Sequence, residues 1–215
     1  MHEQARLAWL RNKLHVNAVC FDFPGYGFST GKVNVKATRE TALEEYDFIH
    51  DHLAAREVGF DGSGPAIVTY GWSIGTELAV HVASQRNVRG LTLQAPPASA
   101  DEMAAWSSKH DVPRLARGLV KVTIDAEVQP IYNNVREISR IPIPLLVVQG
   151  SEDDVVPIAQ GREVFAASPA MQKRSVEVPG AHYSDLRVGH PPAADAVGAF
   201  LQQIATGHSS GNLAR

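Results

Sequence analysis

A serine placed between two glycines is the first group in this chain that could do chemistry. The motif reads Gly71-Trp72-Ser73-Ile74-Gly75. A serine on a sharp turn between a strand and a helix exposes its hydroxyl, and glycines two positions away avoid collisions in such a turn. The backbone N–H of Ile74 would then lie where it can stabilise an oxyanion. The pattern predicts Ser73 as a catalytic nucleophile and Ile74 as an oxyanion donor.

The pentapeptide alone is a weak signal, because a glycine-rich turn between a strand and a helix can carry an incidental serine. Its surroundings strengthen it. Residues Ala66–Tyr70 form a β-branched apolar run directly before the motif, and residues 76–83 have helical spacing directly after it. The context favours the nucleophile over the incidental serine.

A serine hydroxyl is a poor nucleophile until a base accepts its proton. His182 ends the turn Gly180-Ala181-His182, which follows a predicted strand, and loops at such places often carry functional groups. The other histidines fit this role less well. His81 is expected to pack in the core, His190 to lie in a surface loop, and His50 and His52 to lie on an amphipathic helix. We therefore predict His182 as the general base.

Three adjacent acids, Glu152, Asp153 and Asp154, follow the strand predicted before Gly150. Asp153 is the preferred partner for the base, and it would fix the tautomer of His182 and stabilise its imidazolium. Asp154 fits equally well as the N-cap of the following helix. The choice among the three acids stays open, with Asp153 favoured over Asp154 and then Glu152.

Short β-branched runs alternate with helical spacing along most of the chain, which is typical of a parallel sheet built from β-α-β units. A turn is expected at Pro24–Gly27 and a frayed tail in the last ten residues. The strands are expected at Val16–Phe21, Ala66–Tyr70, Gly90–Gln94, Leu145–Gln149 and Arg174–Val178. The main helices are expected at 7–14, 38–57, 76–85, 158–167 and 193–205.

Composition limits the classes of function. The 215 residues suit a single domain, and a net charge of -3 offers no basic surface for nucleic acid. No apolar run reaches the roughly 20 residues of a membrane span, and no signal peptide is visible. The location stays open, with the cytoplasm as the default, because a missing N-terminal segment could have carried a signal or anchor. The single Cys20 is expected to be a buried, inert thiol without a disulfide. No metal-ligand cluster or dinucleotide fingerprint is present, so we expect no cofactor.

The segment Phe21–Ser29, taken with the serine, acid and histidine motifs, resembles the α/β-hydrolase superfamily, in particular its serine aminopeptidase-like and acyl-protein thioesterase-like branches. The resemblance covers residues 5 to 205. It implies an α/β-hydrolase fold, a mostly parallel sheet with helices on both faces, and a small helical lid at about residues 98–140. The lid and the motif would supply side chains for a substrate pocket, each of which could equally serve only to pack the lid: Trp72, Met103, Trp106, Leu115, Leu119 and Tyr132.

The beginning of the chain departs from the family pattern. Members of the family begin with further strands, one of which is followed by a loop that gives a second oxyanion N–H. This chain starts at the helix after that loop, so we expect the N-terminal strands to be missing and the domain to be incomplete. We expect Met1 to be an internal methionine of a longer gene, with a remnant protein as the alternative.

Two functions follow from these expectations. The first is a serine hydrolase that cleaves a small-molecule carboxylic ester, thioester or amide through an acyl-serine intermediate. The alternative is a catalytically impaired fragment or pseudoenzyme that binds a partner through an exposed sheet edge. The sequence does not indicate the substrate or the oligomeric state.

Overall fold

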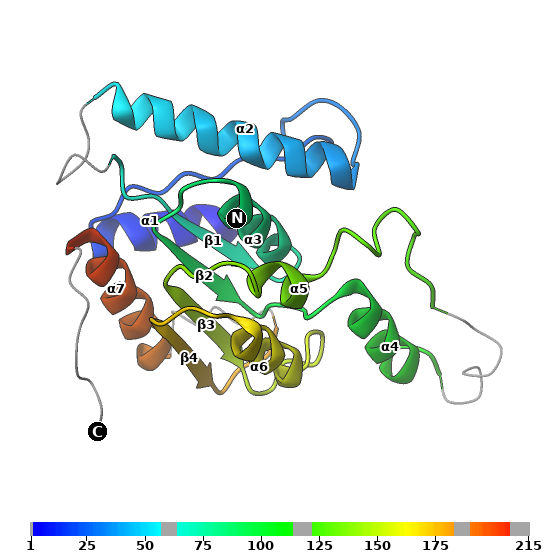
Figure 1. Cartoon of the computed structure of the whole chain (residues 1–215). Coiled ribbons are helices and arrows are strands. Elements are labelled where there is room, and N and C mark those ends of the chain that lie inside the picture. Colours follow the sequence, from blue (N-terminus) through cyan, green and yellow to red (C-terminus); the bar gives the residue numbers. More distant parts are fainter. Residues whose placement is uncertain (1, 57–63, 114–121, 183–189, 207–215) are drawn as a thin grey trace. The chain divides into compact units, whose positions relative to one another are not determined.

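The computed structural model describes residues 2–56, 64–113, 122–182 and 190–206. The chain forms two compact units, residues 1–52 and 53–215. The first unit holds helix α1 (His2–Leu14) and most of helix α2 (Val35–Ala54), both expected from the sequence. The second unit holds a sheet and the remaining helices (Figure 1). Residues 207–215 of the predicted tail lie outside the described residues.

The predicted strand over Val16–Phe21 is wrong, because this segment has no regular secondary structure. An apolar, β-branched run becomes a strand only when a neighbouring strand exchanges hydrogen bonds with it, and the described sheet does not include the segment. The prediction that the Cys20 thiol is buried is also wrong, because Cys20 is exposed. The turn at Pro24–Gly27 is present, and there the Asp22 carboxylate accepts the N–H of Phe28 at 3.1 Å.

The sheet in the second unit has four parallel strands in the order β1-β2-β3-β4. The described strands follow the predicted β-branched runs to within two residues. Their bounds are β1 Val68–Trp72, β2 Gly90–Gln94, β3 Leu145–Gly150 and β4 Lys173–Val178. Strands β2 and β3 are buried along their whole length, as expected for central strands that helices cover on both faces.

Helices α3 (Gly75–Gln85) and α7 (Pro191–Thr206) cover opposite faces of this sheet. In β1 a side chain at Gly71 would meet the start of α3, whereas in β2 a side chain at Gly90 would meet Ile204 of α7 at 3.1 Å. The register pairs Gly90 with Val68, three residues from Gly71, so the two glycines face opposite sides. Helix α6 (Ile158–Ala167) packs on the α3 side, because Gly161 lies against Gln149.

A long excursion connects β2 to β3 and contains α4 (Ala100–His110) and the short α5 (Asn134–Ile138). Its two ends meet, because the N–H of Ala100 donates to the Tyr132 carbonyl at 3.0 Å. The predicted lid at about residues 98–140 lies within this excursion, and its role as a lid stays a prediction. Leu115 and Leu119, two of the proposed pocket residues, lie outside the described residues. None of the helices in the described ranges is long and apolar enough to cross a membrane.

Candidate active site

Ser73 lies on the turn between β1 and α3 and has a φ of 52°. This left-handed conformation is strained for a residue with a side chain, at a cost of roughly 1–3 kcal/mol, and such strain persists only where the surroundings impose it. Here the backbone N–H of Ser73 donates to the carbonyl of Gln94 at the end of β2, at 2.9 Å. The neighbouring strand therefore holds the serine in its strained conformation at the carboxyl end of β1.

The two glycines of the motif differ in what surrounds them. A β-carbon at Gly71 would lie 2.5 Å from the Gly75 carbonyl oxygen and 2.5 Å from the α-carbon of Thr76. A β-carbon at Gly75 would meet nothing within 4 Å, because Gly75 begins α3 with its free side in open space. The expectation that both positions exclude a side chain holds for Gly71 and is wrong for Gly75.

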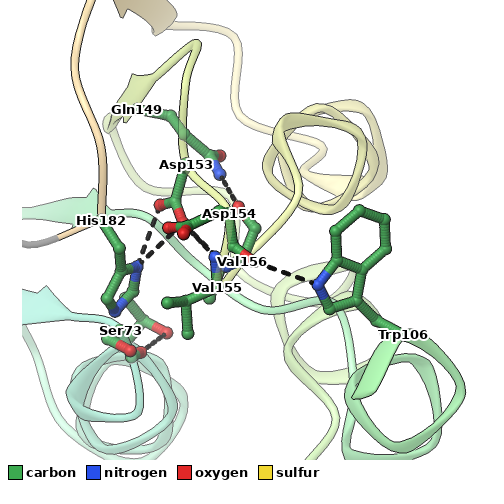
Figure 2. Close-up of polar contacts among 9 residues, drawn as sticks. Ser73, Trp106, Gln149, Asp153, Asp154, Val155, Val156 and His182 are labelled. Carbon is green, nitrogen blue, oxygen red and sulfur yellow. Dashed lines mark hydrogen bonds and ion pairs between the residues drawn. The ribbon is translucent and has the colours of Figure 1, made fainter. Parts of the chain in front are cut away.

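Among the three adjacent acids, Asp153 contacts the histidine. The Nδ1 atom of His182 lies 2.9 Å from Oδ2 and 3.1 Å from Oδ1 of Asp153, and both side chains are buried (Figure 2). Asp154 and Glu152 are exposed. The N-cap of α6 is Pro157, without a side-chain cap, so Asp154 does not take the N-cap role that it could have had.

The acid is held by its own loop. Its Oδ1 atom accepts the backbone N–H of Val155 at 3.0 Å and that of Val156 at 2.8 Å. These bonds fix the carboxylate with one edge toward the histidine. A carboxylate that accepts the Nδ1–H of an imidazole leaves the Nε2 atom without a proton, so that this atom can act as a base.

His182 lies between the acid and the serine. Figure 2 shows the ring edge opposite Asp153 directed toward Ser73. The ring also packs beside the indole of Trp72, which directly precedes the serine, with ring centroids 5.7 Å apart. The structure thus brings the three residues expected to react, Ser73, Asp153 and His182, to one end of the parallel sheet.

The loops that carry the acid and the histidine are fastened to each other. The N–H of Ser151 donates to the Val178 carbonyl at 2.8 Å, and the N–H of Glu152 donates to the Gly180 carbonyl at 3.0 Å. The approach is close enough that a β-carbon at Gly150 would lie 2.1 Å from the Gly180 oxygen. Backbone contacts between the two loops therefore set the spacing of Asp153 and His182.

The remaining pocket candidates lie at different places around this centre. The indole N–H of Trp106, on α4, donates to the Asp154 carbonyl at 3.3 Å, and its ring stacks on His110. Met103, also on α4, is half-buried.

The hydroxyl of the buried Tyr132 donates to the Ile74 carbonyl at 3.4 Å. Burial, and next the nearby Glu77 charge, raise the pKa of Tyr132 above its usual value, so this hydroxyl keeps its proton.

Two further residues at the turn that carries Ser73 were not predicted from the sequence. The Thr76 hydroxyl donates to the Ser73 carbonyl at 2.6 Å, and the side-chain amide of Asn134 donates to the Thr76 hydroxyl at 3.0 Å. A threonine in the first turn of a helix is a common signal for such a backbone contact. Asn134 gives no comparable signal, because it lies 58 residues further along the chain. Within the described residues, no group of three or more histidines, cysteines and acids could hold a metal ion.

Comparison with known proteins identifies related chains. A family model described as "Alpha/beta hydrolase family" matches residues 2–203. The Mycobacterium tuberculosis protein Rv2307c is 31% identical over 185 residues, which are 85% of this chain and 58% of that protein. Human alpha/beta hydrolase domain-containing protein 17C is 26% identical over 182 residues, 83% of this chain and 47% of that protein. The chain spans about half the length of the curated relatives it matches.

A solved structure shows the same fold. The Pyrococcus furiosus esterase Pf2001 superposes with a TM-score of 0.66 at 20% sequence identity, covering 91% of this chain and 73% of the esterase. At this level of identity the likeness concerns the arrangement of strands and helices.

Proposed function

Because the chain belongs to the alpha/beta hydrolase family, we propose that it is a serine hydrolase that cleaves a carboxylic ester, thioester or amide through an acyl-Ser73 intermediate. The observation that carries this proposal is the buried contact between Asp153 and His182, with the histidine ring directed toward a serine on a strained turn. A buried carboxylate–imidazole pair beside a hydroxyl is the arrangement that makes a serine nucleophilic.

The first half of the reaction forms the acyl-enzyme. The Ser73 oxygen attacks the carbonyl carbon of the substrate while Nε2 of His182 takes the hydroxyl proton. The negative charge that develops on the carbonyl oxygen is stabilised by the N–H of Ile74. As the tetrahedral species collapses, the bond to the leaving group breaks, and the imidazolium gives its proton to the departing alcohol, thiol or amine.

The second half repeats these steps with water. His182 takes a proton from water, the resulting nucleophile attacks the acyl carbon, and the proton returns to the Ser73 oxygen as the acid product leaves. Asp153 stays ionised in both halves. It orients the ring and stabilises the imidazolium, a role that its two backbone hydrogen bonds support by fixing the carboxylate.

The acyl group would lie against side chains that border the reacting serine. We propose Trp72, Met103, Trp106 and Tyr132 for this contact, since Trp72 and Tyr132 touch the residues around Ser73 and Trp106 touches the acid loop. Their apolar surfaces suit an acyl or aromatic group rather than a charged one.

A covalent probe tests the proposal. The 215-residue chain is treated with a fluorophosphonate, digested, and examined by tandem mass spectrometry for the position of the adduct. We expect phosphonylation on Ser73, none in Ser73→Ala, and none in chain that has been unfolded in urea before treatment, because the unfolded serine has no base beside it.

The opposite results would remove the proposal. A chain that folds by circular dichroism but carries no adduct at Ser73 would show that the acid–base pair does not activate this serine. The alternative, a catalytically impaired protein that binds a partner through a sheet edge, would then be favoured. An adduct on another serine would show that the nucleophile is not Ser73.

A further inference from the structure

The Ser73 carbonyl and the Ile74 N–H belong to one peptide unit. A trans peptide is planar, so its carbonyl and its N–H point in opposite directions. The groups that hold the Ser73 carbonyl therefore also set the direction in which the Ile74 N–H points. The direction matters because a hydrogen bond weakens steeply once the donor turns away from its acceptor.

Thr76 holds this carbonyl with two donors. Its backbone N–H lies 3.0 Å from the Ser73 oxygen, and its hydroxyl lies 2.6 Å from the same oxygen. The Thr76 side chain is fully buried. Water therefore does not compete for the hydroxyl, whose direction depends on its protein neighbours alone.

Asn134 fixes the direction of the Thr76 hydroxyl. The Nδ2 atom of Asn134 lies 3.0 Å from Thr76 Oγ1 and 2.8 Å from the Pro97 carbonyl. The Pro97 oxygen only accepts, so the amide must present its NH2 group here, and its two hydrogens serve these two acceptors. Nδ2 cannot accept in return, so Asn134 takes no hydrogen from the Thr76 hydroxyl. The Tyr132 hydroxyl also contacts Thr76 but donates to the Ile74 carbonyl. The Thr76 hydroxyl donates to the Ser73 carbonyl at 2.6 Å.

We propose that Asn134 and Thr76 are positioning residues that aim the Ile74 N–H at the substrate oxyanion. The inference deepens the proposed function and rests on it. It links the far end of the excursion, where Asn134 begins α5, to the stabilisation of charge at the reacting carbon. Asn134 acts through Thr76 and touches neither the substrate nor the reacting atoms.

Kinetics of a p-nitrophenyl ester test the proposal. Thr76→Val keeps the shape but removes the hydroxyl, and we expect kcat to fall roughly ten- to a hundredfold with KM unchanged, because a misdirected donor loses part of the ~10²–10³ that an oxyanion donor contributes. Thr76→Ser, which retains the hydroxyl, should keep most of the kcat of the parent chain. Asn134→Leu should lower kcat in the same way and by less.

The double variant isolates the connection. If Asn134 acts through Thr76, adding Asn134→Leu to Thr76→Val should cause no further fall in kcat, whereas independent effects would multiply. Thr92→Val is the matched control, since Thr92 is a fully buried threonine of β2 whose hydroxyl has no hydrogen-bond partner within the described part of the chain. It should leave kcat unchanged. Urea unfolding shows which variants are folded under the assay conditions.

The outcomes separate this inference from the function beneath it. If the parent chain hydrolyses the ester and Thr76→Val retains full kcat, or if the two single effects multiply, the positioning role is wrong and the hydrolase stands. If Thr76→Val does not fold, the test compares Asn134→Leu with Thr92→Val. A lower kcat at unchanged KM in Asn134→Leu alone supports the positioning role, and equal kcat values in the two variants contradict it. If the parent chain carries no fluorophosphonate adduct at Ser73, the hydrolase proposal fails and this inference falls with it.

Discussion

Replacing Asp153 with asparagine is expected to lower kcat for ester hydrolysis by about 10⁴-fold. An asparagine at this position can present its NH2 group to Nδ1 of His182, which then has to accept. The ring is thereby stabilised in the tautomer with its proton on Nε2, the nitrogen that should take the proton of Ser73. The measurement is steady-state hydrolysis of a p-nitrophenyl ester, with the rate of fluorophosphonate labelling as a second readout.

The neighbouring acids provide matched controls for this variant. Asp154 and Glu152 are exposed, so Asp154→Asn and Glu152→Gln should change kcat by no more than about twofold, as is usual for surface substitutions. Asp153→Asn should also stay folded, because an amide oxygen can still accept the N–H groups of Val155 and Val156. If Asp154→Asn lost most of its activity while Asp153→Asn stayed normal, Asp154 would be the acid and the assignment to Asp153 would be wrong.

The choice among these acids shows where sequence reasoning ends. The strand before them and the glycine that closes it could be predicted, because an apolar β-branched run bounded by a glycine is a local property. Which of three consecutive carboxylates turns inward depends on the backbone of the loop. In the structure that loop is fastened to the Gly180 carbonyl by the N–H of Glu152, a contact between segments almost thirty residues apart that no local pattern records.

The first unit shows a different limit. The run Val16–Phe21 has the composition of a strand, and its composition misled both the strand prediction and the prediction of a buried Cys20. A strand requires hydrogen bonds from a second segment, so β-propensity describes what a segment can do once a partner is beside it. The four runs that did become strands, β1 to β4, each have such a partner in the described sheet.

The glycine before the nucleophile should be essential for the fold of the turn. A β-carbon at Gly71 would lie 2.5 Å from two backbone atoms, the Gly75 oxygen and the Thr76 α-carbon. Backbone cannot rotate away as a side chain can, so the start of α3 would have to move away from β1. We expect Gly71→Ala to lower the free energy of unfolding by about 1–3 kcal/mol, the usual cost of overpacking, and to slow fluorophosphonate labelling of whatever remains folded. Urea unfolding and labelling time courses measure the two effects.

Gly75→Ala separates crowding from the mere loss of a glycine. Its β-carbon would meet nothing within 4 Å, and alanine is the better helix former by about 1 kcal/mol in a helix interior. At the first residue of α3 the gain should be smaller, so we expect unchanged or slightly higher stability and normal labelling. If both variants were equally damaged, the turn would need flexibility at each glycine rather than space at one. Equal tolerance of both would mean that α3 can shift without disturbing Ser73, so the close packing of α3 on Gly71 would not be what positions the nucleophile.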